Sequence, residues 1–318
     1  MVRTGASVAG MIGLLTLAAC ALPGAPGSDT GSATMLMVAF KQGGSYRYHY
    51  HVTVTGTTGI GQGRDQPIKL DSSADVTWRV TSVDAAGNTT IDVTLDNFKT
   101  TMTGSLAPGS STTSTTTSDS RHSTITVAPS GEIVSGGSSL GAAAALSPFP
   151  GTSPPGTDQF LAVLPDHSVR PGDTWTRSVT LPGPPGQPGM SFTTDNRFVR
   201  YDDLKTGRAA VVETRASVPI DTTVDLGQLP PGAPPAAVPQ LGYKVHSQGT
   251  LSFDTTTWFD TRTHVVERTR SVDSSDITTS ISGPPPPVQP SGPALPSSIF
   301  PGSVRSRSTQ TLELDLLS

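Results

Sequence analysis

The chain has 318 residues and a formal net charge of −4 at pH 7. This balance argues against nucleic-acid binding, which requires basic patches. Hydrophobic residues make up 34% and aromatic residues 5%, while Gly and Pro number 33 and 29. Together with abundant Ser and Thr, this composition indicates short strands separated by long loops. The single cysteine cannot form a disulfide within the chain, so the fold must rest on its hydrophobic core.

The first nineteen residues have the layout of a signal peptide. Arg3 gives a positive start, and the apolar stretch from Val8 to Ala19 is shorter than the about 20 residues of a membrane span. It ends in Leu17-Ala18-Ala19-Cys20, which resembles the lipobox of bacterial lipoproteins. The resemblance implies cleavage between Ala19 and Cys20 and acylation of Cys20 with diacylglycerol and palmitate. The protein would then be anchored to the cell membrane on its extracytoplasmic side; an ordinary secretory signal is the alternative.

Composition shifts along the chain predict its organisation. We expect a signal peptide over 1–19, the lipidated Cys20 and a Gly-, Pro- and Ser-rich tether over 20–39, a first β-unit over 40–150, a short helix and a second β-unit over 151–282, a Pro-rich linker over 283–303 and a C-terminal strand over 304–318. The turn glycines of the two units recur at a nearly constant offset. This spacing is consistent with a duplicated β-unit, or with hairpins that recur in any β-rich chain.

Alternating apolar side chains predict most of the strands. Tyr46, Tyr48, Tyr50, Val52 and Val54 share one face of a half-buried strand. A hairpin is expected to join strands at 68–82 and 89–100 through a turn containing Gly87 and Asn88. Further strands are expected at 190–202, 208–218, 243–258, 263–272 and 275–282, and the Ser/Thr run 110–120 is interpreted as a strand paired with 122–128.

Helix signals are confined to two short segments, 140–146 and 157–164. The predicted fold class is therefore all-β, β-rich with one or two short helices. Its antiparallel curved sheets could form two similar half-barrel or sandwich units.

Candidate catalytic and metal-binding motifs are few. Gly137-Ser138-Ser139-Leu140-Gly141 matches the Gly-x-Ser-x-Gly elbow of hydrolases, with Asp166 and His167 later in the chain, but such a match arises easily in a Gly- and Ser-rich chain. His49 and His51 share one strand face, yet zinc needs three or four protein ligands. The Gly-rich segment 59–63 lacks the Lys-Ser/Thr of a P-loop. We therefore predict no catalytic, cofactor-binding or metal-binding residues, and no enzymatic activity.

The aromatic residues allow two interpretations. Most fall on strand positions, where they either pack in the core or line an apolar cavity. The order of motifs, from the Tyr-rich strand to Leu164-Pro165 and Pro171-Gly172-Asp173-Thr174-Trp175, resembles a group of all-β bacterial lipoproteins and, more distantly, the half-barrel lipoprotein carriers of the LolA and LprG types. We accordingly expect a non-enzymatic binding or structural module whose partner is the membrane, with an apolar small molecule or an envelope protein as a further partner. The alternatives are a carrier of an apolar ligand and, remotely, a cell-envelope hydrolase.

Overall fold

The computed structural model describes residues 32–60, 65–104, 112–118, 120–136, 163–181, 190–225, 244–283 and 303–317. They form one antiparallel sheet, which confirms the predicted all-β class. The strands are β1 Ser45–Ile60, β2 Gln66–Val83, β3 Thr89–Gly104, β4 Thr112–Ser118, β5 Arg121–Val127, β6 Ile133–Gly136, β7 Thr174–Leu181, β8 Met190–Leu204, β9 Gly207–Asp225, β10 Lys244–Asp260, β11 Val266–Ser282 and β12 Ser303–Leu317.

The predicted helices lie almost entirely outside the described residues. Segment 140–146 and most of segment 157–164 are not described, and Val163 and Leu164 at the end of the second segment are not helical. Among the described residues, no helix has the length and hydropathy needed to cross a membrane.

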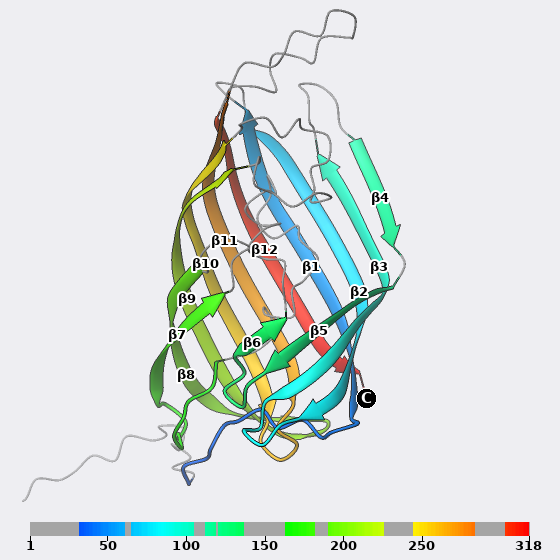
Figure 1. Cartoon of the computed structure of the whole chain (residues 1–318), viewed down its shortest axis with the longest axis vertical. Helices are drawn as coiled ribbons and strands as arrows, with labels where there is room; N and C mark the ends of the chain where they lie inside the picture. The colour runs from blue at the N-terminus through cyan, green and yellow to red at the C-terminus, as the bar shows by residue number, and fades with distance from the viewer. Residues whose placement is uncertain are drawn as a thin grey trace, which may run out of the picture.

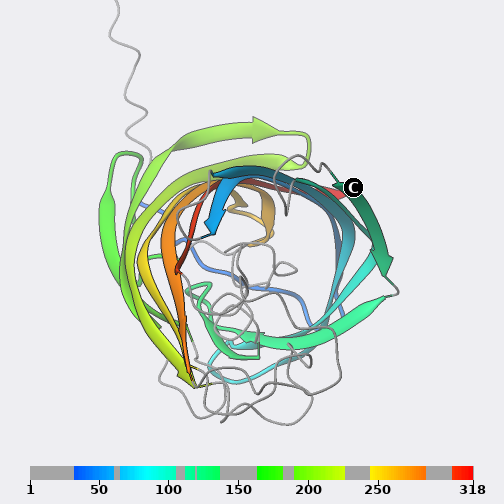
Figure 2. The same ribbon diagram turned by 90° about the horizontal axis from the view of Figure 1, so that it is seen from above.

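The C-terminal strand lies in the middle of the sheet. The strand order is β6-β5-β3-β2-β1-β12-β11-β10-β9-β8-β7, so β12 separates strands β1–β6 from strands β7–β11. The two predicted β-units therefore form the two halves of one continuous sheet. They meet at β12, which pairs with β1 and with β11 (Figure 1). Seen from above, the long strands curl around a common axis (Figure 2). The ladder is not closed between the described strands at its two ends.

The local strand predictions are confirmed, except for one pairing and one break: the two strands expected at 263–272 and 275–282 are a single strand, β11. β2 and β3 form the expected hairpin, and Asp84 closes its turn by accepting the amide hydrogens of Ala86 and Asn88 at 2.8 and 2.9 Å. The Ser/Thr run does form a strand, β4, but it pairs with residues 98–104 of β3 rather than with β5. β5 pairs with residues 89–95 of the same strand. Both shorter strands therefore pair with the same edge of the long β3, one after the other along its length.

The concave face of the sheet is apolar toward the end that holds the hairpin turn at Asp84. Tyr48 and Trp78 are completely buried there, and their rings lie 4.7 Å apart. The core continues along the concave face on the strands to either side of β12. Its further members are Tyr50, Val52, Val76, Val80, Ile91, Val93, Ile125, Phe198, Val212, Phe259, Leu312 and Leu314. The alternation of β1 is thus used as predicted, with its Tyr and Val side chains inward.

The segment before β1 covers this apolar end of the concave face, which we call the closed end. Leu36, Val38 and Phe40 are buried in the same core, and the Phe40 ring contacts Trp78 edge-on at 5.8 Å. Thr34 pairs with Val169 through two backbone hydrogen bonds of 2.9 Å. Residues 32–39 were predicted as part of the tether, whereas the structure packs them across the closed end of the sheet. Their alternating apolar side chains pack against the apolar residues at this end of the curved sheet, which the strands themselves do not cover.

Residues 163–175 complete this closed end. Leu164 and Val169 are buried in the core, and Trp175 donates from Nε1 to the carbonyl oxygen of Val163 at 3.0 Å. Gly172 adopts φ +99, a left-handed backbone conformation that favours glycine at the turn before β7. The closed end is therefore built from two connecting segments as well as from the sheet.

Candidate functional site

Beyond the apolar end, the concave face carries a polar band along its two central strands. We name this band the central stripe: Ser271, Asp273 and Ser275 of β11, and Ser306, Ser308 and Gln310 of β12. All six side chains are buried. The register pairs Asp273 with Gln310 and Ser275 with Ser308. At the standard rise, four residues of strand make the stripe roughly 13 Å long.

Apolar side chains flank the central stripe on both sides. On β1 and β2, Val54 and Leu70 stand in the same row as Asp273 and Gln310. On β10, Phe253 is the direct cross-strand partner of Asp273, and Leu251 is the partner of Ser275. Around Asp273 and Ser275 the concave face is thus amphipathic across the strands, with a polar centre and apolar margins. At the two ends of the stripe the neighbours are polar, with Thr255 of β10 beside Ser271 and Thr58 of β1 beside Ser306.

Two glycines let the sheet bend around the stripe. Gly56 of β1 faces Ser308, and a Cβ there would lie 2.3 Å from the carbonyl oxygen of Arg307. Gly249 of β10 faces Ile277, and a Cβ there would lie 2.1 Å from the carbonyl oxygen of Asp276. Neither approach is possible with a side chain. The two strands that border the β11–β12 pair therefore come unusually close to it.

Asp273 is the one ionisable group of the stripe. Its carboxylate accepts hydrogen bonds from the hydroxyl of Ser271 and, at 3.3 Å, from Nε2 of Gln310. Burial raises the pKa of Asp273 from 3.8 to about 6, although the hydrogen bond from Ser271 opposes the shift. Tyr50 lies close enough to feel the charge of Asp273: burial, and in second place this charge, raise the pKa of the Tyr50 phenol. The carboxylate is thus held in a poorly solvated position.

Two stripe atoms have unused hydrogen-bonding capacity. Oε1 of Gln310 and the hydroxyl of Ser306 are buried and have no hydrogen-bond partner among the described residues. The hydroxyls of Ser275 and Ser308, by contrast, bond each other at 2.8 Å. A buried amide oxygen without a partner costs about 1–3 kcal/mol, so this position favours a donor supplied from elsewhere.

An aromatic pair borders the stripe beside Asp273. The rings of Phe253 and Phe192 are stacked at 6.2 Å between centroids. The strand between them contributes Ala216 opposite Phe253, which leaves room for the two rings. Both rings are only partly buried.

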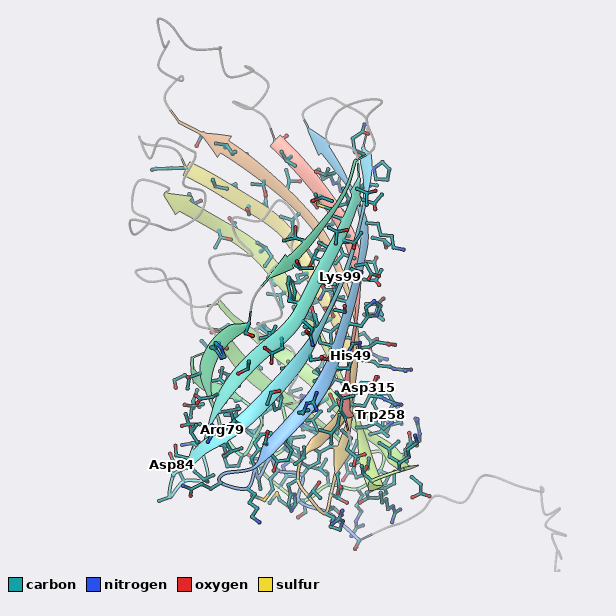
Figure 3. The ribbon with its side chains drawn as sticks, turned by 90° about the vertical axis from the view of Figure 1, so that its right-hand side faces the viewer. His49, Arg79, Asp84, Lys99, Trp258 and Asp315 are labelled. Atoms are coloured by element: carbon teal, nitrogen blue, oxygen red, sulfur yellow. The ribbon has the colours of Figure 1, made fainter. Side chains whose placement is uncertain are left out.

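The outer face of the sheet is charged and hydroxylated instead. His49 and His51 lie there, as the alternation predicted, and contact Asp75 and Asp71 of β2 at 3.4 and 3.3 Å. Figure 3 shows His49 of β1 close to Asp315 of β12, its register partner. No group of three or more potential metal ligands was found among the described residues. The two histidines belong to separate cross-strand pairs.

A second set of buried carboxylates lies at the β10–β11 turn. Oδ1 of Asp260 accepts the amide hydrogens of Arg262 and Thr263 at 2.6 and 3.0 Å, and these bonds lower the pKa of Asp260 against the opposing effect of burial. Burial raises the pKa of Glu267, which accepts a hydrogen bond from Thr206. These groups tie the turn to β11 and to the β8–β9 turn, which is a structural role.

The remaining sequence-derived candidates are not brought together. Cys20 and Ser139 lie outside the described residues. Asp166 and His167 are exposed, 3.0 Å apart, and Asp166 also contacts Arg177 at 3.4 Å. The central stripe was not predicted. Its signal was the spacing Ser271-x-Asp273-x-Ser275 and Ser306-x-Ser308-x-Gln310, which reads equally well as a solvated strand face.

The chain matches no protein-family model, and no curated protein is similar to it in sequence. Three solved structures are similar to the chain at low identity and with low TM-scores. A structure of lipovitellin, described for its lipid–protein interactions, has a TM-score of 0.41 and 10% identity over 88% of this chain; the chain spans 25% of that protein. An outer membrane channel from Pseudomonas putida F1 has a TM-score of 0.27 and 6% identity over 88% of this chain and 97% of the other.

A putative exported protein with a YmcC-like fold, from Bacteroides fragilis NCTC 9343, has a TM-score of 0.18 and 10% identity over 86% of this chain and 96% of the other. The last two proteins are bacterial and are described as exported or outer-membrane proteins. The expected likeness to LolA- and LprG-type carriers stays a prediction. TM-scores this low assign no function, and the fold class rests on the strands of the chain itself.

Proposed function

We propose that the chain is a lipid-anchored, extracytoplasmic and non-enzymatic binding module whose concave face holds a small amphipathic molecule. The observation that carries this proposal is the central stripe, a buried polar band between apolar margins in which Oε1 of Gln310 has no hydrogen-bond partner among the described residues. A ligand with one polar edge and two apolar sides would complement this surface.

A purely apolar ligand is a poorer match to the described residues. The apolar closed end of the concave face is already occupied, because Leu36, Phe40 and Trp175 are buried in one core with Tyr48 and Trp78. The central stripe, which extends beyond that core, would lose hydrogen bonds to water if hydrocarbon covered it. An amphipathic ligand avoids this cost because its polar groups replace the water.

The anchor follows from the lipobox Leu17-Ala18-Ala19-Cys20. Cys20 precedes Ser32, where the described chain begins, by a short Gly- and Pro-rich segment. Residues 34–40 cover the closed end of the sheet. The described chain therefore enters the fold at the closed end of the sheet. Two acyl chains suffice for stable membrane attachment.

Native mass spectrometry of the full chain with Cys20→Ser, which carries no lipid, tests the binding function. We expect a bound small molecule in this protein and in the further variant Thr309→Val, which alters the outer face of β12. Gln310→Met keeps the side-chain volume but removes the amide, and we expect it to lose the bound molecule. A bare mass in all three proteins, together with no binding of added amphiphiles, would contradict the proposal.

Metabolic labelling with an alkyne analogue of palmitate tests the anchor separately. The wild-type chain should incorporate the label and sediment with membranes. Cys20→Ser should do neither. Labelling that persists in Cys20→Ser would place the acyl group elsewhere and exclude the lipobox as its origin.

A further inference from the structure

We propose that the amphipathic ligand carries an ammonium group, which binds between Asp273 and Gln310 on the concave face. This inference rests on the proposed binding function and adds the chemical class of the ligand. It follows from three features of the site: an uncompensated carboxylate, a second acceptor beside it and an aromatic face next to both.

The carboxylate of Asp273 has no cationic partner among the described residues. None of the ion pairs formed by the described residues includes it, and its two described hydrogen bonds come from neutral donors, Ser271 and Gln310. Asp276, three residues later on the outer face of the same strand, is paired with Arg305 at 2.8 Å and with Arg307 at 3.2 Å. A buried charge without a partner is unfavourable, so the inner position favours a cation from a ligand.

Gln310 presents a second acceptor at the same place. Its Nε2 donates to Asp273, and its Oε1 is left without a partner among the described residues. Asp273 and Gln310 are direct cross-strand partners, so the two acceptors lie side by side. An ammonium group donates up to three hydrogen bonds and accepts none, which suits a position with two acceptors. A carboxylate or phosphate ligand would instead be repelled.

The surroundings select an organic cation over a metal ion. Phe253, the cross-strand partner of Asp273 on β10, is stacked with Phe192, and an aromatic face attracts a cation within about 6 Å. Leu251 and Val54 extend the apolar margins on either side of the stripe. A hydrated metal ion gains little from these hydrocarbon surfaces, and one carboxylate supplies few of the oxygen ligands that Ca²⁺ needs. An alkyl chain attached to the ammonium group would instead cover the hydrocarbon surfaces of Phe253, Leu251 and Val54.

Isothermal titration calorimetry with octylammonium, octanol and octanoate, on the full chain with Cys20→Ser at pH 7.5, tests the inference. We expect octylammonium to bind at least tenfold more tightly than octanol, and octanoate to bind most weakly. Adding Asp273→Asn, which keeps the side-chain shape, should remove the preference for octylammonium. The matched control, Asp276→Asn on the outer face, should keep it.

The pH dependence gives a readout that a merely structural aspartate would not affect. Asp273 must lose its proton to bind the cation, and burial raises its pKa to about 6. Affinity for octylammonium should therefore fall about tenfold between pH 7.5 and pH 5. The titratable group facing Asp273 among the described residues is Tyr50, whose raised pKa keeps it neutral in this range. The affinity of Asp273→Asn should not change with pH.

The outcomes separate the two proposals. Equal binding of octylammonium and octanol, unaffected by Asp273→Asn, would overturn the ammonium site while leaving an amphiphile-binding face in place. Failure of all three probes to bind would overturn both the ammonium site and the proposed binding function. A preference for octylammonium that Asp276→Asn removes and Asp273→Asn keeps would move the cation to the outer face and also overturn the inference.

Discussion

The two ends of the concave face use the same strands in opposite ways. At the closed end, inward positions of β1, β2 and β12 carry Tyr48, Trp78 and Leu314, which pack against the chain's own covering segments. Farther along, inward positions of β11 and β12 carry Asp273 and Gln310. Both sets of side chains are buried, but they differ in chemistry. The first packs through hydrocarbon and aromatic rings, and Nε1 of Trp78 is its one polar atom without a hydrogen-bond partner among the described residues, whereas the second is polar and contains a carboxylate.

Under the proposed function, this difference separates stability from binding within one sheet. Apolar side chains that fill a core give the fold its free energy and leave nothing for a ligand. Buried polar groups with unused capacity contribute little stability, and they stay useful only if something supplies the missing partner. We therefore expect substitutions at the closed end to affect mainly stability and substitutions in the central stripe to affect mainly binding and pH dependence.

The largest expected effect comes from the closed end. Trp78→Ala removes a completely buried ring that contacts Tyr48 and Phe40, and should lower the free energy of unfolding by about 3–5 kcal/mol. Urea titration followed by far-UV circular dichroism measures the change. Arg79→Ala, at the next, exposed position of β2, is the control and should change stability by no more than about 0.5 kcal/mol. Similar losses for both variants would mean that the closed end does not depend on this ring.

The second prediction concerns Asp273 and pH. Its folded pKa of about 6 exceeds the reference value of 3.8, so the folded state binds the proton more tightly than the unfolded state. The wild type should therefore gain up to about 3 kcal/mol of stability relative to Asp273→Asn as pH falls from 8 to 4. Denaturant titrations of both proteins at these pH values measure it. A constant difference would show that Asp273 is well solvated.

The local parts of the fold could be predicted because their signals are local. The Tyr and Val alternation of β1 and the Asp84–Asn88 turn each lie within a few residues, and both are found as expected. The position of β12 could not be predicted in this way. It pairs Tyr50 with Leu314, residues far apart in the sequence, and a Pro-rich segment separates it from β11. No local pattern states which distant strand will be the neighbour.

The site escaped prediction for a different physical reason. On β11, the alternation rule favours Val272 inward and Asp273 outward, yet Val272 is 52% exposed and Asp273 is 7% exposed. The facing is imposed by the rest of the strand, because Thr269 is buried opposite Leu314 of β12 and the backbone alternates from there through Ser271 to Asp273. A strand with polar residues on both faces does not reveal its buried side until its neighbours are known.

The third prediction tests how closely the strands approach around the stripe. Gly249→Ala would place a Cβ 2.1 Å from the carbonyl oxygen of Asp276 and force β10 away from β11. We expect a loss of about 1–3 kcal/mol and weaker binding of amphiphiles, because Leu251 and Phe253 would move with the strand. Ser252→Ala on the same strand is the control. An unchanged free energy of unfolding would mean that the sheet can flatten there without cost.

The smallest expected effect comes from the outer face of the stripe strand. Val272 lies between Asp254 of β10 and Thr311 of β12, and Thr has nearly the same shape and strand preference. Val272→Thr should therefore change stability by less than about 0.5 kcal/mol, whereas Val52→Thr, which buries a hydroxyl in the core, should cost about 1–3 kcal/mol. Thermal unfolding of both variants gives the comparison. A large loss at Val272 would mean that the outer face is covered in the working protein, and the distinction between a solvated outer face and a binding inner face would fail.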